Sequence, residues 1–162
     1  PYGYPGAAAK RALARDYAAR GVYEIDMVMN YGAARGGDWA TVETEIRGVV
    51  EEAHAKNVGV KVIFETRQLE AEQIRRATEV SIAAGADFVK TSTGFNGAGA
   101  TEEAVRIMLD TAAGRAKVKP SGGIRDFAAA KKYVEMGAAR LGVGYSSCGV
   151  ICSGEGASTE NY

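Results

Sequence analysis

Short apolar runs alternate with longer amphipathic stretches along most of the chain. The short runs have strand length, whereas the longer stretches repeat their apolar positions with helical spacing. This pattern predicts strands at 22–29, 60–64, 88–90, 118–119 and 140–144. It predicts helices at 7–20, 39–56, 70–84, 101–113 and 126–136. Such alternation favours an α/β fold with right-handed βαβ crossovers and a parallel sheet.

The ends of the expected helices carry their own signals. Asp38, Thr101 and Asp126 precede three of them, and each side chain can accept a hydrogen bond from the first turn. Glycine commonly follows the last helical turn because it adopts the left-handed conformation at no steric cost. Three glycines hold such positions: Gly21, Gly85 and Gly137.

Two lysines stand where an apolar strand becomes a loop. Lys90 lies in the string VKTSTGF and Lys119 in the string VKPSGGIR, while Asp26 lies inside the apolar run EIDMV. Two amines and a carboxylate on neighbouring buried strands are costly to remove from water. Two interpretations stay open, a buried ion pair that serves the fold and an amine nucleophile tuned by its neighbours.

These strings, together with KVIFET at 61–66, closely resemble deoxyribose-phosphate aldolase. The resemblance covers about residues 1–151, and the two lysine strings are specific in combination but much less so apart. It implies a class I, Schiff-base aldolase on a (β/α)8 TIM barrel. An enzyme of this kind needs no metal or other cofactor.

Side-chain alternation along the strands predicts which groups point into such a barrel. Asp26 lies on the polar face of the first strand, and Lys61 and Glu65 share one face of the second. The outer face packs on helices and must be apolar, so these polar side chains are expected to point inwards. Lys90 and Lys119 would then lie at the C-terminal rim, where barrel enzymes build their active sites.

The number of strands falls short of a closed barrel. Five are expected, with the end of a possible sixth at 1–6, whereas a barrel of this class needs eight. By resemblance the segment 1–6 follows the third strand, so the first two strands and most of the third, with a further active-site aspartate, are missing. We expect one incomplete barrel domain at 1–151 and a flexible polar tail at 152–162. Either a preceding segment is omitted or the fragment assembles with another copy.

The resemblance assigns a role to each charged group. Lys90 is the Schiff-base nucleophile, and its amine must be neutral to attack, whereas free lysine has a pKa near ~10.4. Lys119 is the neighbouring cation that would lower this pKa, together with burial. Asp26 would move protons as the carbinolamine and enamine form. Lys61 and Glu65 would support this network, although a purely structural ion pair explains them equally well.

Two loops favour a phosphorylated substrate. Gly122 and Gly123, in the second lysine string, can offer backbone N–H groups to an anion. Gly144, Ser146 and Ser147 lead into a short helical turn, where an N-terminus and hydroxyl groups favour phosphate. We therefore expect the phosphate of the substrate to bind between these two loops.

Three further side chains are candidates for the substrate pocket. Ser92 and Thr93 follow the first lysine and are expected to shape the substrate end. Tyr162 ends the polar tail, and we hypothesise that it folds over the mouth and assists proton transfer at the enamine carbon. The alternative for this tail is a disordered terminus with no role in catalysis.

Composition narrows the class of partner. The 162 residues are 46% hydrophobic and 25% charged with a formal net charge of +0, as in a soluble globular domain. The chain has no excess of basic residues of the kind that binds nucleic acid. No apolar run approaches the ~18 residues that a membrane span needs. Cys148 and Cys152 form no disulfide framework, and with His54 isolated we expect no metal site. We expect a cytoplasmic protein whose partners are a phosphosugar and an aldehyde, as a possible homodimer.

The resemblance implies a reversible lyase reaction in deoxyribonucleotide catabolism. The enzyme would cleave 2-deoxy-D-ribose 5-phosphate to D-glyceraldehyde 3-phosphate and acetaldehyde. One alternative is another Schiff-base aldolase acting on a different sugar phosphate. A second is a catalytically inactive, phosphosugar-binding fragment that lacks the missing strands.

Overall fold

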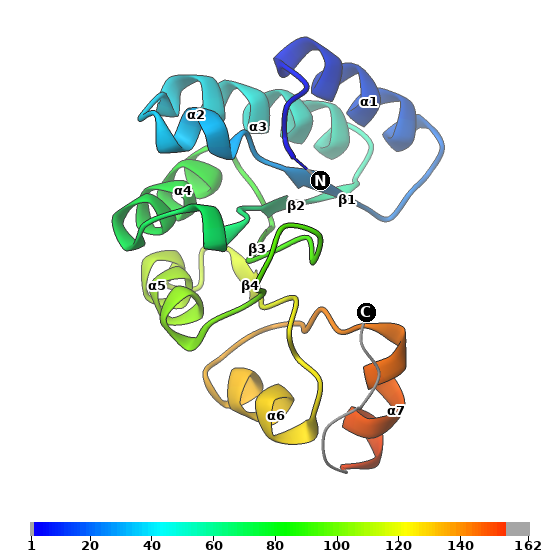
Figure 1. Ribbon diagram of the computed structural model, residues 1–162. Helices are drawn as coiled ribbons and strands as arrows, with labels where there is room; N and C mark the ends of the chain where they lie inside the picture. The colour runs from blue at the N-terminus through cyan, green and yellow to red at the C-terminus, as the bar shows by residue number, and fades with distance from the viewer. Residues whose placement is uncertain (1, 155–162) are drawn as a thin grey trace.

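Four strands alternate with helices in the computed structural model, which describes residues 2–154 (Figure 1). The strands are β1 (Glu24–Val28), β2 (Gly59–Ile63), β3 (Phe88–Lys90) and β4 (Lys117–Lys119). The first helices are α1 (Ala7–Ala19), α2 (Tyr31–Arg35), α3 (Trp39–His54) and α4 (Ala71–Ala83). The later helices are α5 (Glu102–Ala112), α6 (Phe127–Glu135) and α7 (Tyr145–Ser153), and a 3₁₀ turn, η1 (Thr66–Gln68), follows β2.

The strands form one parallel sheet in the order β1-β2-β3-β4. Asp26 is paired in register with Lys61, and Lys90 is paired with both Ile63 and Lys119. Since side chains alternate along a strand, this register places the charged residues of neighbouring strands on one face. The helices α1 to α5 form an arc around the other face (Figure 1). The fold is therefore part of a (β/α) TIM barrel, as expected.

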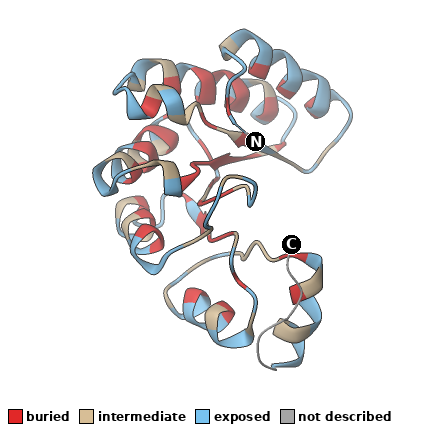
Figure 2. Cartoon of the chain, in the orientation of Figure 1, coloured by how far each residue is buried: buried red, intermediate tan, exposed pale blue. Residues whose placement is uncertain are grey.

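The hydrophobic core lies between the sheet and this arc of helices. Val60, Val62 and Val89 point outwards from the strands and are fully buried against apolar helix residues such as Ile46 and Met108. In Figure 2 the buried residues follow the strands and the inner sides of the helices. Burial of each such side chain contributes about 1.5–3 kcal/mol, so the outer layer fixes the positions of the strands.

Most helix ends agree with the sequence signals. The side chains of Asp38, Thr101 and Asp126 accept hydrogen bonds from backbone N–H groups three residues further on, at 3.1, 3.2 and 2.7 Å. The three glycines that were expected to end helices all have positive φ angles: Gly21, Gly85 and Gly137. Local capping therefore fixes where these helices begin and end.

One expected strand is wrong. The segment 140–144 makes only an isolated bridge, between Ser121 and Gly142. Gly122 and Gly123 have φ angles of 83° and 76°, so the chain turns away from the bridge at once. A ladder cannot continue across such a turn, because successive residues no longer point their amides at the neighbouring strand. The short helix α2 and the turn η1 were not expected, and β1 is shorter than the range 22–29.

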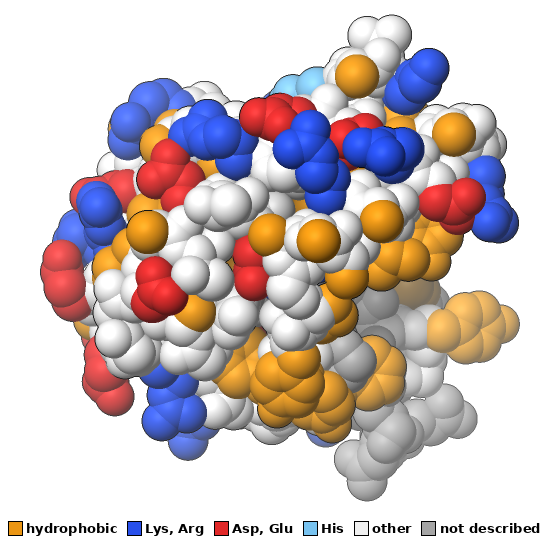
Figure 3. Space-filling view, turned by 90° about the horizontal axis from the view of Figure 1, so that it is seen from above, with side chains coloured by type: hydrophobic (Ala, Val, Ile, Leu, Met, Phe, Trp, Pro, Cys, Tyr) orange, Lys and Arg blue, Asp and Glu red, His pale blue; other side chains and the backbone are white. Residues whose placement is uncertain are grey.

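Charged side chains of both signs cover the outer helices. Arg11 and Arg15 on α1 pair with Glu52 on α3, at 2.7 and 2.8 Å. Figure 3 shows this face, with Lys and Arg side chains interspersed among Asp and Glu. None of the helices described at 2–154 is long and apolar enough to cross a membrane.

Candidate active site

A carboxylate lies between two amines on the inner face of the sheet. Lys61 on β2 donates a hydrogen bond to Oδ1 of Asp26 at 2.8 Å, and Lys90 on β3 donates to Oδ2 at 3.2 Å. The pairing of β1 with β2 and of β2 with β3 brings these side chains to one place. The expectation that they point inwards together is thus met by the geometry. However, Asp26 is only partly buried, because β1 is an edge strand of the sheet, and its side chain is 38% exposed.

Two residues that the sequence did not single out extend this network. Glu24, two residues before Asp26, forms a short ion pair with Lys61. Arg140 lies beyond β4 in the chain, yet its Nη1 donates to both carboxylate oxygens of Glu24 at 3.0 Å. Glu24 could have been found from its alternation with Asp26. Arg140 could not, because its contact spans the inner face from one side of the sheet to the other.

The charges of the cluster change the proton affinity of two members. Burial opposes ionisation of Asp26, but the hydrogen bond from Lys61 and the charge of Lys90 outweigh it and lower its pKa below the usual value. Burial, followed by the nearby charges of Lys61 and Lys90, lowers the pKa of Lys119. The site therefore favours an ionised carboxylate and makes a protonated amine costly.

A cavity of about 380 Å³ opens beside the two candidate lysines. Lys90 and Lys119 line it, together with Gly122, Gly123 and Arg125 from the loop after β4. Thr93 also lines it. The cavity is suited to a small phosphorylated molecule, because the backbone N–H of Gly123 can bind an anion, whereas the N–H of Gly122 donates to the Gly142 carbonyl at 3.4 Å. Arg125 adds a cation that sequence reasoning did not select.

The second expected phosphate loop is not part of this cavity. Gly144 precedes helix α7, and the N–H of Ser147 donates to its carbonyl at 3.0 Å. Ser147 is buried. The cavity is instead lined on this side by Gly142 and Val143, whereas Gly144, Ser146 and Ser147 do not line it. The helical turn thus exists, but the residues at its N-terminus do not line the cavity beside Lys90.

Comparison with known proteins identifies the family. A sequence model described as DeoC/LacD family aldolase matches residues 8–154. The chain belongs to this family. A deoxyribose-phosphate aldolase from Exiguobacterium sp. is 47% identical over 148 residues, which are 91% of this chain and 65% of that protein. The expected resemblance is confirmed.

Two solved structures support the same assignment. One, described as an aldolase, has a TM-score of 0.81 and 41% identity, covering 88% of this chain and 63% of that one. The other, a tetrameric deoxyribose phosphate aldolase from Aeropyrum pernix, has a TM-score of 0.83 and 30% identity, covering 94% and 64%. This member of the DeoC/LacD family therefore spans less than two thirds of the length of these three relatives.

Glu65 lies outside the cluster formed by Asp26, Lys61 and Lys90. It follows β2 in a left-handed conformation, with φ 58°, and is almost fully buried. Its carboxylate accepts hydrogen bonds from the backbone N–H of Thr93 at 2.7 Å, from the Thr93 hydroxyl at 2.5 Å and from the Asn96 amide at 2.8 Å. Glu65 thus holds the loop after β3, and it does not join the Lys61 network as the alternation had suggested. Ser92, in the same loop, is buried and its hydroxyl has no hydrogen-bond partner.

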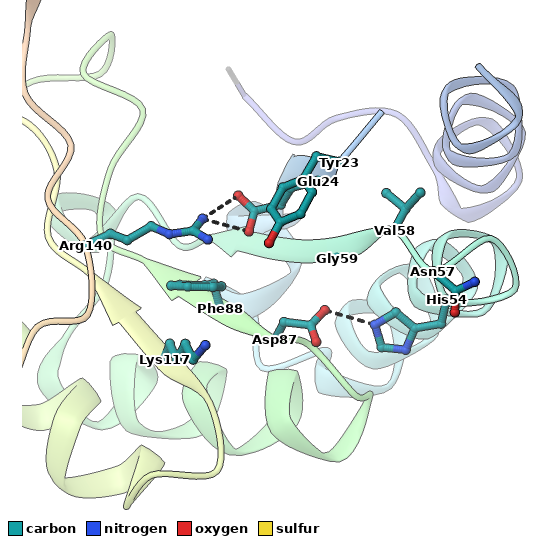
Figure 4. Close-up of a pocket in the computed structure, with 10 residues that line it drawn as sticks. All are labelled: Tyr23, Glu24, His54, Asn57, Val58, Gly59, Asp87, Phe88, Lys117 and Arg140. Carbon is teal, nitrogen blue, oxygen red and sulfur yellow. Dashed lines mark hydrogen bonds and ion pairs between the residues drawn. The ribbon is translucent and has the colours of Figure 1, made fainter. Parts of the chain in front are cut away.

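A second cavity, of about 530 Å³, lies at the opposite end of the strands (Figure 4). Glu24 and Arg140 line it, and Figure 4 shows the Arg140 side chain reaching over the ring of Phe88 towards Glu24. His54 pairs with Asp87 at 2.9 Å on the other side of this cavity.

Within 2–154, no group of three or more His, Cys, Asp or Glu side chains could hold a metal ion. Tyr162 lies outside the described residues.

Proposed function

We propose that this chain carries the catalytic lysines of a deoxyribose-phosphate aldolase. The reaction is the reversible cleavage of 2-deoxy-D-ribose 5-phosphate to D-glyceraldehyde 3-phosphate and acetaldehyde. The observation that carries the proposal is the Asp26 carboxylate between Lys61 and Lys90, beside a cavity that Lys119 also lines. The family membership of the chain supports a carbon–carbon lyase, and the 47% identity to a deoxyribose-phosphate aldolase supports this substrate.

Lys90 is the proposed nucleophile. Its neutral amine attacks the carbonyl carbon, and the carbinolamine loses water to give an iminium ion. The C3 hydroxyl group then loses its proton to a base, the adjacent C2–C3 bond breaks, and the iminium accepts the electron pair of that bond. An enamine of acetaldehyde remains on the lysine, and C3 leaves as the aldehyde carbon of glyceraldehyde 3-phosphate. Protonation of the enamine carbon and hydrolysis then release acetaldehyde and restore the amine.

Asp26 and Lys119 are proposed to serve this chemistry in different ways. Asp26 accepts and returns protons near the nitrogen, since its carboxylate lies within hydrogen-bond distance of Lys90. Lys119 contributes positive charge at the site, which favours the neutral form of the neighbouring amine. Burial and the charges of Lys61 and Lys90 lower the pKa of Lys119 itself, so the amines of the site compete for few protons and the trapping experiment decides which of them reacts.

The phosphate of the substrate is proposed to bind at the loop after β4. Gly123 offers its backbone N–H and Arg125 offers a cation in the same cavity, whereas Gly122 donates its own N–H to the Gly142 carbonyl at 3.4 Å and is proposed to shape the turn. Thr93 lines the cavity at the side of Lys90, which supports a role for it and for Ser92 in shaping the aldehyde end. Gly144, Ser146 and Ser147 remain proposed contacts only for a substrate that extends beyond this cavity.

The decisive experiment traps the imine. The purified chain is incubated with acetaldehyde and borohydride, and the adduct is located by intact mass and peptide mapping. One ethyl addition on Lys90 is the expected result, and the variant Lys90→Leu should give none. An adduct on Lys119 would reverse the two roles. No adduct on either lysine would favour the inactive, phosphosugar-binding fragment over the lyase.

Substrate profiling separates the remaining alternative. Another Schiff-base aldolase of the same fold would form an imine with its own donor but would not use acetaldehyde as the donor in synthesis.

We also propose a cytoplasmic location, a homodimer in solution, and a single domain at 1–151 followed by a tail at 152–162. Light scattering at two protein concentrations tests the dimer, and limited proteolysis tests the domain boundary.

A further inference from the structure

We propose that Glu24 and Arg140 are positioning residues for Asp26, acting through Lys61. The inference deepens the proposed function and rests on it for its meaning in catalysis. It concerns the end of the strands opposite to the substrate cavity, where neither residue lines the space beside Lys90.

The side chains form an unbroken series of ion pairs across the inner face. Arg140 donates to Glu24 at 3.0 Å, Glu24 pairs with Lys61, and Lys61 donates to Asp26 at 2.8 Å. Asp26 then accepts from Lys90 at 3.2 Å. Each carboxylate in this series lies between two cations, so a change at one end alters how the next cation is shared.

Lys61 is the member through which the effect passes. Its side chain is 3% exposed, so it exchanges few hydrogen bonds with water and divides its protons between Glu24 and Asp26. The interaction of charges is stronger here than at the surface, because the effective dielectric constant is lower. Arg140 partly neutralises Glu24, so Glu24 competes less for Lys61. Lys61 then holds Oδ1 of Asp26, and this orientation of the carboxylate points Oδ2 towards Lys90.

The position of Arg140 itself is fixed by packing. Its guanidinium lies 4.2 Å from the centre of the Phe88 ring, and the ring is buried on β3. A cation over an aromatic face is attracted by the ring, which adds to the ion pair with Glu24. Figure 4 shows this stack, with Arg140 reaching across Phe88 to the carboxylate on β1. Arg140 thus links the segment beyond β4 to the opposite edge of the sheet.

The charged groups that face Asp26 come from every strand of the sheet. They are Glu24 on its own strand, Lys61 on β2, Lys90 on β3 and Lys119 on β4. Removing the negative charge of Glu24 should make Asp26 easier to ionise. Removing the positive charge of Arg140 should do the opposite, because Glu24 then competes more strongly for Lys61. The inference therefore predicts opposite effects from the two members of one ion pair.

The first test measures the titration of the Asp26 carboxyl group by NMR in the intact chain. Glu24→Gln should move the midpoint to lower pH, Arg140→Met should move it to higher pH, and Arg140→Lys should restore it. The matched control is Glu79→Gln, which removes an exposed carboxylate that pairs with Arg76 at 3.0 Å on α4. Shifts in the same direction for both variants, or no shift in either, would overturn the inference even if the chain forms no imine.

The second test uses the proposed reaction. Exchange of the donor's α-protons with deuterated water, divided by the amount of trapped imine, should fall roughly tenfold in Glu24→Gln, because Asp26 is held more tightly by Lys61 and becomes a weaker base. In an Asp26→Asn background the same change should have no further effect. Equal losses in both backgrounds would mean that Glu24 acts only on the fold. Absence of an imine in the unmodified chain would instead refute the proposed function, and the titration would still decide the role of Glu24 and Arg140.

Discussion

The buried carboxylate of Glu65 provides a sharp test of how the loop beside the site is held. Replacing Glu65 with alanine removes the acceptor of three hydrogen bonds, from the N–H and hydroxyl of Thr93 and from Asn96. Hydrogen bonds to a charged group contribute about 1.5–3 kcal/mol each. Removal of the carboxylate also removes the cost of burying it, so we expect a net loss of about 2–4 kcal/mol in the free energy of unfolding.

The backbone at Glu65 allows a comparison that separates the hydrogen bonds from strain. Its φ of 58° is left-handed, a conformation that costs a residue with a Cβ roughly 1 kcal/mol and costs glycine almost nothing. Glu65→Gly should therefore be more stable than Glu65→Ala by about 0.5–1 kcal/mol, the reverse of the order in most folded segments. Both should remain less stable than the unmodified chain.

Urea denaturation followed by circular dichroism measures these differences directly. Glu79→Ala is the matched control, since that carboxylate is exposed and its loss should change the stability by less than about 0.5 kcal/mol. A glycine variant less stable than the alanine variant would refute the argument from strain. Two variants as stable as the control would refute the argument that Glu65 holds the loop.

Three further predictions concern other parts of the molecule. Lys119→Leu should slow imine trapping at Lys90 severalfold at neutral pH but much less at pH 9, because a nearby cation favours the neutral amine; equal loss at both pH values would contradict this. Gly122→Ala should destabilise the chain by about 1–3 kcal/mol in urea, because φ is 83° and the new Cβ would lie 2.8 Å from Gly99 Cα; an unchanged midpoint would contradict it. The pKa of Asp87 is lowered since its hydrogen bonds and the charge of His54 outweigh its burial. The ionised Asp87 carboxylate thus stabilises the fold above about pH 3.9, and this stabilisation is lost as the pH falls through the lower pKa of the folded state. Asp87→Asn should therefore flatten the acid limb of a plot of stability against pH.

The sequence predicted those parts of the fold that local signals determine. Helix ends follow from side chains such as Asp38 and Thr101, whose acceptors lie next to the groups that they satisfy. The strands β2 and β3 follow from short apolar runs. The expected strand at 140–144 was wrong for the opposite reason, since its pairing depends on the turn at Gly122, in the loop after β4. A pattern of apolar residues cannot report such a partner.

The same distinction applies to the site. The positions of Asp26, Lys90 and Lys119 could be predicted because Asp26 interrupts an apolar strand and each lysine ends one, and the register of a parallel sheet then brings them together. Glu65 was placed in the wrong network because its left-handed backbone ends the alternation on which the argument relied. Arg140 was missed because no local pattern distinguishes it from the other arginines of the chain. Its contact with Glu24 arises only from the three-dimensional arrangement of the sheet.

The balance of charge on the inner face explains why these residues suit an amine nucleophile and an anionic substrate. Arg140, Lys61, Lys90 and Lys119 bring four cationic groups, whereas Glu24 and Asp26 bring two carboxylates. Like charges at short range raise the free energy of the fully protonated cluster, so the loss of one proton from an amine relieves repulsion. The remaining excess of positive charge attracts a phosphate group. Both carboxylates pair with Lys61, and only Asp26 also contacts Lys90, at 3.2 Å. Because two carboxylates face four cationic groups, the cluster can hold the fold together without pairing every amine.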